Sequence, residues 1–141
     1  MAKSKVDWFG EDVMLKVVSA TRQAIEATAI RVVGQTEINI TANNQVDTGF
    51  MRNSVYFATK DDSTYEDADT DGAYVNLQGD LVERSLAPEA PLPAEYDALV
   101  CIGADYAIFQ EMANSFLYPA LQQVRGEVKG ILQRTAKEAG L

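Results

Sequence analysis

Residues 11–42 carry the feature that most limits the folds open to this chain, a helical periodicity kept up over about nine turns. Apolar or small side chains recur every three or four positions, with charges mostly between them, at Met14, Val17, Val18, Thr21, Ala24, Ile25, Thr28 and Val32. Asn43 and Asn44 provide a stop. The pattern predicts one long helix whose apolar stripe the rest of the chain must cover.

The rest of the chain has shorter segments that are typical of strands and helices. Strand patterns occupy 54–59, 74–78 and 98–103, and the last is continuously apolar, as in a buried strand. A short helix or turn is expected at 106–112, and a last helix from Asn114 onward. The order predicts a single α+β domain over 1–141, with a long N-terminal helix, a small antiparallel sheet of three to four strands and a long C-terminal helix packed on it.

The charge is concentrated in the middle of the chain. Residues 61–97 hold eleven acids and one base, Arg84, within a chain of net charge −9. Three of the four prolines lie there too. We therefore expect 61–97 to be an acidic, partly irregular insertion between strands, and 1–10 to be an N-terminal tail.

The composition excludes several functional classes. The chain has no His, which rules out Ser-His-Asp triads, Cys-His pairs and His-ligated zinc. A single Cys, Cys101, rules out an internal disulfide and a thiolate cluster. No apolar run approaches the ~20 residues of a membrane span, and the start has no signal-peptide core, so no membrane partner is expected. A pI near 4.4 disfavours tight wrapping of nucleic acid.

Two acidic motifs invite a chemical interpretation. Asp47-Thr48-Gly49 is the signature triplet of aspartic proteases, so a retrovirus-like homodimeric protease is one alternative. Asp67, Asp69 and Asp71 have the alternate spacing of a calcium loop, but Gln78 replaces the closing Glu, and a solvated acidic turn is the simpler interpretation. A generic α+β binding module is a further alternative. No spacing selects a catalytic pair, and we predict no catalytic residue, metal or cofactor.

Three short segments resemble one family. They are Val46-Asp47-Thr48-Gly49-Phe50-Met51-Arg52-Asn53-Ser54-Val55, Tyr106-Ala107-Ile108-Phe109-Gln110-Glu111 and Phe116-Leu117-Tyr118-Pro119-Ala120-Leu121. Together they are similar to the minor tail component, or neck and tail-completion, family of long-tailed double-stranded DNA bacteriophages. The chain departs from the family at Phe50-Met51, where a basic residue and Leu are usual, and at 112–115, which replace a longer Gly-rich segment.

The resemblance implies a virion structural protein of the neck or proximal tail, made in the host cytoplasm and without catalytic activity. Members of the family form rings, six-fold by analogy, that join the head connector to the tail. The implied partners are further copies of the chain, a head-closure or connector protein, and a tail terminator or tail tube protein. Double-stranded DNA would pass through without specific binding.

The motif residues have structural interpretations from their chemistry alone. A turn that leads into a strand is expected from Asp47, Thr48, Gly49, Arg52 and Ser54, with Asp47 capping the turn, Gly49 supplying a positive φ, and Arg52 and Ser54 alternating at strand period. Positioning of the last helix on the sheet is expected from Tyr106, Phe109, Glu111, Phe116 and Pro119.

Two further sets are candidates for contacts made in an assembly. Trp8 and Phe9 precede the long helix and are expected to cap the core or to dock on a neighbouring subunit. Repulsion of DNA from the wall of a ring is expected from Asp61, Asp62, Glu66, Asp67, Asp69 and Asp71. An outward, solvated loop is the alternative for these acids.

Overall fold

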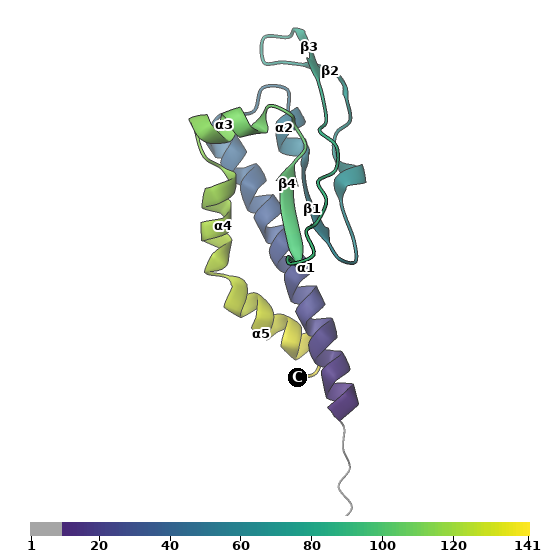
Figure 1. Cartoon of the computed structure of the whole chain (residues 1–141). Helices are drawn as coiled ribbons and strands as arrows, with labels where there is room; N and C mark the ends of the chain where they lie inside the picture. Colours follow the sequence, from purple (N-terminus) through teal and green to yellow (C-terminus); the bar gives the residue numbers. More distant parts are fainter. Residues whose placement is uncertain (1–9) are drawn as a thin grey trace, which may run out of the picture.

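The computed structural model describes residues 10–141 (Figure 1). The helices are α1 (Gly10–Ala42), α2 (Phe50–Asn53), α3 (Ala107–Ala113), α4 (Leu117–Arg125) and α5 (Val128–Glu138). The strands are β1 (Val55–Thr59), β2 (Gly72–Val75), β3 (Leu81–Arg84) and β4 (Ala98–Ile102), and a 3-10 turn, η1, covers Tyr65–Asp67. The α+β class and the long first helix are confirmed.

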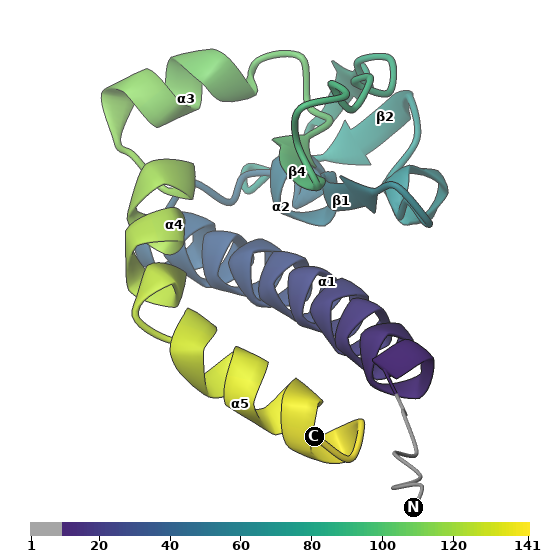
Figure 2. The ribbon, with the colours of Figure 1, turned by 60° about the horizontal axis from the view of Figure 1, so that its bottom comes forward.

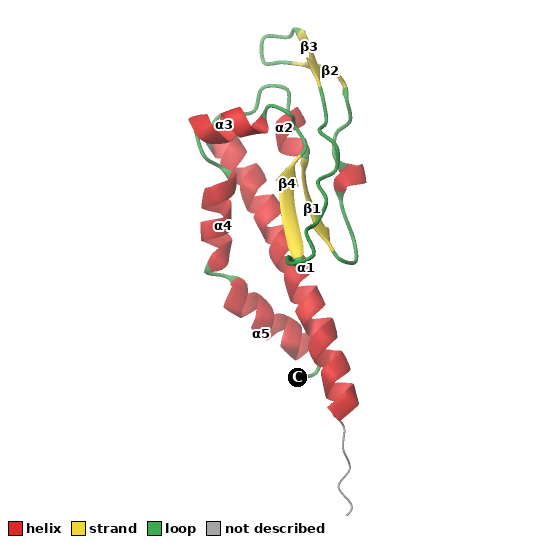
Figure 3. Cartoon of the chain, in the orientation of Figure 1, coloured by secondary structure: helices red, strands yellow, loops and turns green. Residues whose placement is uncertain are grey.

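The four strands form two separate ribbons in place of one sheet (Figure 3). β1 pairs antiparallel with β4, and β2 pairs antiparallel with β3. The outer edge of β1 is closed by the chain that follows it, because the Thr64 N–H donates to the Phe57 carbonyl at 2.9 Å and Ser63 bridges Ala58. β2 therefore begins where no β1 edge is left to extend, and the acidic segment continues as its own hairpin.

The single C-terminal helix expected from Asn114 onward is divided in the structure into two helices, α4 and α5. α4 begins at Leu117 rather than at Asn114, and it ends at Arg125, before Gly126. α5 then runs back along the first half of α1, so that α4 and α5 lie on one side of α1 and the strands on another (Figure 2). The corner between α4 and α5 is fixed to α1 by Glu127, which accepts hydrogen bonds from Arg31 at 2.8 and 3.2 Å.

The largest buried side chains gather at the C-terminal end of α1. Ile40, Phe50 and Phe116 are fully buried there, beside Met51 and Val55. This end of the molecule joins α1, α2, β1 and the start of α4 in one core. The opposite end of α1 extends past the body of the fold (Figure 1). Within residues 10–141 no helix is both long and apolar enough to cross a membrane.

Candidate functional site: the corner of the three motifs

The first motif makes a turn that depends on Gly49. Its φ is +83°, in the left-handed region that L side chains rarely adopt, and the expected positive φ is confirmed. The Thr48 hydroxyl accepts a hydrogen bond from the Phe50 N–H at 3.2 Å. Together they direct the Phe50 ring into the core immediately after α1 has ended.

Asp47 does not cap its own turn, so that expectation is wrong. Its Oδ1 accepts a hydrogen bond from the Leu77 N–H at 3.1 Å, and its Oδ2 lies 3.3 Å from Nη2 of Arg84. Both partners belong to the β2–β3 hairpin, 30 and 37 positions further along the chain. The carboxylate therefore ties the turn to the hairpin.

Arg84 is the residue of this corner that sequence reasoning missed. Its guanidinium lies over the Tyr106 ring, 5.1 Å from the centroid, and its Nε is buried without a hydrogen-bond partner in the described structure. Burial raises the pKa of Tyr106, and the neighbouring Arg84 charge opposes that rise. A cleft of about 480 Å³ lies here between the turn, the hairpin and α3. The available signal was that Arg84 is the one base within 61–97.

The end of the first motif is helical before it is extended. Arg52 lies in α2 and its Nη1 is 3.4 Å from the Thr41 hydroxyl, so the expected strand alternation from Arg52 to Ser54 is wrong. One turn of helix follows Gly49, and the Asn53 N–H donates to the Gly49 carbonyl at 2.9 Å. Ser54 is fully buried, where its hydroxyl donates to the Met51 carbonyl and accepts from the Ala104 N–H.

The second and third motifs meet through Glu111. Its carboxylate accepts hydrogen bonds from the N–H groups of Phe116, Leu117 and Tyr118 at 2.9, 3.0 and 3.2 Å. Pro119, the next residue, has no N–H. One side chain therefore satisfies the donors at the start of α4 that have no partner within the helix. Partial burial acts to raise the pKa of Glu111, but these hydrogen bonds outweigh it and the pKa is lowered.

The aromatic residues of these motifs divide into buried and exposed sets. Phe116 is fully buried, whereas Phe109 is 70% exposed, so its expected packing between helix and sheet is wrong. The buried residue of α3 is Ala107, and a position two residues later points to the opposite side of a helix. Phe109 thus faces outward, beside the exposed side chains of Ile108 and Met112.

Among the exposed apolar side chains, three groups lie on different parts of the molecule and are called patches below. The α1 tip, defined as residues 10–15, exposes Val13, Met14 and Leu15. The α3–α4 corner exposes Ile108, Phe109, Met112 and Tyr118. The hairpin exposes Val75, Leu77 and Leu81. Trp8 and Phe9 lie outside the described residues.

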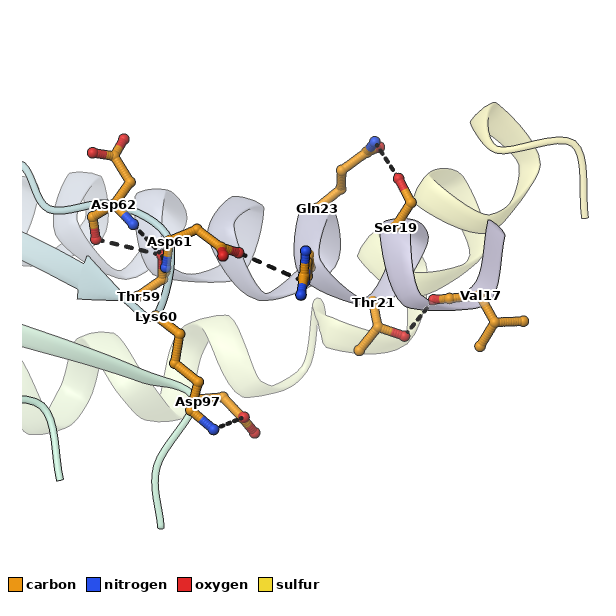
Figure 4. A network of polar contacts seen from close by, with 10 residues as sticks. Val17, Ser19, Thr21, Gln23, Thr59, Lys60, Asp61, Asp62 and Asp97 are labelled. Atoms are coloured by element: carbon orange, nitrogen blue, oxygen red, sulfur yellow. Dashed lines mark hydrogen bonds and ion pairs between the residues drawn. The ribbon is translucent and has the colours of Figure 1, made fainter. Parts of the chain in front are cut away.

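The six acids expected to line the inner wall, or lumen, of a ring are spread over the acidic segment. Asp61 faces α1, where its Oδ2 lies 3.7 Å from Nε of Arg22, and Lys60 beside it pairs with Asp97 (Figure 4). Asp71 accepts a hydrogen bond from the Leu86 N–H. The other acids of the set, Asp62, Glu66, Asp67 and Asp69, lie on the turn and on η1 and its flanks. Among residues 10–141 no group of three or more acids, Cys or His is placed to hold a metal ion.

Comparison of the chain with protein-family models, with characterised proteins and with solved structures finds no match.

Proposed function

We propose that this chain is a structural subunit of a bacteriophage neck, which forms a ring between the head connector and the tail. The observation that carries the proposal is the set of three exposed apolar patches on separate elements. Apolar patches rich in aromatic residues and Met are typical of protein–protein interfaces. A subunit within a stack of rings needs neighbours on both sides and along the axis, and apolar patches on separate elements suit contacts with different neighbours.

The hydrogen bonds made by two acids of the motifs support the same proposal. Asp47 and Glu111 use their carboxylates to hold a hairpin and a helix start, which are mechanical roles. These contacts fix the α3–α4 corner and the β2–β3 hairpin relative to α1. Two of the three patches lie on those elements, so the contacts of Asp47 and Glu111 set where these patches can meet neighbouring proteins.

The aspartic protease stays a prediction of a different class. In that mechanism the Asp shares a proton with a second carboxyl group. Here one oxygen of Asp47 faces the Arg84 guanidinium and the other faces a backbone N–H, which favours a structural role. Pepstatin-sensitive cleavage by the purified chain, abolished by Asp47→Asn, would support the protease instead.

A complementation experiment tests the neck proposal. In a phage that encodes this chain, a nonsense mutation of its gene is expected to give filled heads and free tails that are not joined. Adding the purified wild-type chain should restore joining, and Phe109→Glu/Met112→Glu should not. Ile38→Glu is a matched control because Ile38 is also an exposed apolar residue but lies outside the three patches. Joined, infectious particles formed without the chain would contradict the proposal.

A further inference from the structure

An apolar groove of about 510 Å³ runs beside the middle of α1. Its floor is α1 from Thr21 to Val32, one wall is the start of β4, and the other wall is α4 and α5. Leu121 and Leu132 line the second wall and remain 46% exposed each. Both walls pack on α1, and the apolar space between them is open to solvent.

The α1 tip is the complementary feature of the same chain. Met14 and Leu15 are 63% and 69% exposed. With Val13 they are consecutive, and successive residues of a helix point about 100° apart. Three apolar side chains that face three directions cannot be covered by one flat surface, whereas a groove with a floor and two walls contacts all of them.

The acidic start of the tip and the basic edge of the α4–α5 wall carry opposite charges, and the one charged residue of the groove lining, Asp97, is paired with Lys60 at 3.4 Å. Glu11 and Asp12 directly precede the apolar residues of the tip. On the groove wall, Arg125 shares a helix face with Leu121, four positions before it, and Lys129 shares one with Leu132, three positions after it. The acidic start of α1 therefore matches the basic edge of the α4–α5 wall.

We infer that the α1 tip of one subunit docks in the α1–β4–α4/α5 groove of a second copy of this chain. The contact is heterologous, because it joins two different surfaces, and it leaves the groove of one subunit and the tip of the other free for further copies. Such a contact propagates, and with a suitable rotation it closes into a ring. The inference deepens the proposed function and rests on it for that closure.

Sedimentation of the purified full chain, measured as a function of concentration, tests the docking. Met14→Glu disables the tip and Leu132→Glu disables the groove; both positions are exposed and helical, where Glu is well tolerated. Each variant alone is expected to associate at least about tenfold more weakly than wild type. Ile38→Glu, at an exposed helical position outside both the three patches and the groove, is the matched control and should associate as wild type does.

Mixing the two variants is the decisive step. Met14→Glu keeps an intact groove and Leu132→Glu keeps an intact tip, so a one-to-one mixture is expected to form heterodimers and nothing larger. Wild-type association by either variant alone, or a mixture that stays monomeric, would overturn the docking. So would a wild-type chain that is monomeric at every concentration.

The docking and the neck proposal fail in different ways. If the chain restores head–tail joining but does not associate through its tip and groove, the docking inference is wrong and the neck proposal stands. If the chain associates through its tip and groove but is not needed to join heads to tails, the docking inference stands and the neck proposal is wrong.

Discussion

The carboxylate of Glu111 accepts a hydrogen bond from the Leu117 N–H at 3.0 Å, across the corner between α3 and α4. Three polar side chains at the end of α1 reinforce the same corner: Asn39 donates to the Phe116 carbonyl, Asn43 to Ser115 and Gln45 to Asn114. The corner is therefore held by hydrogen bonds to its backbone groups as well as by the fully buried Phe116 side chain. The second and third motifs act as one unit, in which the acid of one caps the helix opened by the other.

Replacing Glu111 should weaken the fold and its response to acid. We expect Glu111→Gln to lower the free energy of unfolding at neutral pH by about 1–2 kcal/mol, as the loss of a helix cap typically does. The folded pKa is lowered, so the carboxylate stabilises the fold above its unfolded pKa, and this contribution is lost as the pH falls through the folded pKa. Urea unfolding at a series of acidic pH values measures both effects.

The control for that series is Glu138→Gln, at the exposed end of α5. It should leave the neutral-pH stability nearly unchanged. If Glu111→Gln and the control unfold in parallel with wild type at every pH, the cap contributes nothing to stability.

Gly49 gives a test of the turn geometry. An Ala side chain there would meet only Asn53, at an ordinary 3.7 Å, so the cost comes from the φ of +83°. We expect Gly49→Ala to destabilise by about 1 kcal/mol or more. Gly34→Ala is the matched control, because Gly34 lies in α1 with nothing within 4 Å of the new Cβ. Helix propensity predicts that Gly34→Ala stabilises by up to about 1 kcal/mol, so thermal unfolding should shift in opposite directions.

The sequence predicted the long helix well because its periodicity is local. It also predicted β1 and β4 nearly to the residue, since runs of β-branched, apolar and aromatic residues are typical of strands, although β4 is only partly buried. The pairing of the strands depends on residues 60–71, whose turn covers the β1 edge, and no periodicity encodes that. The partner of Asp47 was equally hidden, because Arg84 lies in a different element and only the folded chain brings the two together.

The contact between Asp47 and Arg84 can be measured by a double-mutant cycle. We expect Asp47→Asn and Arg84→Met each to destabilise the chain, and the double variant to lose about 0.5–1 kcal/mol less than the sum of the two. The Arg84 side chain is mostly shielded from solvent, so the coupling should persist in moderate salt. Strictly additive losses would show that the hairpin is held to the turn by other contacts.

The acidic segment allows a test of the lumen hypothesis that spares the fold. Asp62 and Asp71 should be kept, because their carboxylates accept hydrogen bonds from backbone N–H groups. The test variant therefore neutralises only four of the six acids: Asp61→Asn, Glu66→Gln, Asp67→Asn and Asp69→Asn. Its melting temperature should stay close to that of wild type, since exposed ion pairs such as Asp61–Arg22 contribute little.

If these acids line a channel, assembled particles carrying the variant should eject DNA more slowly, because a less repulsive wall retains phosphates for longer. The delay should shrink as salt is raised and the field is screened. A control variant neutralises exposed acids outside the segment, Glu26, Asp105 and Glu138, and should eject normally. Ejection kinetics equal to wild type at every salt concentration would assign the segment to the outer surface of the neck, where its charge keeps the particle soluble.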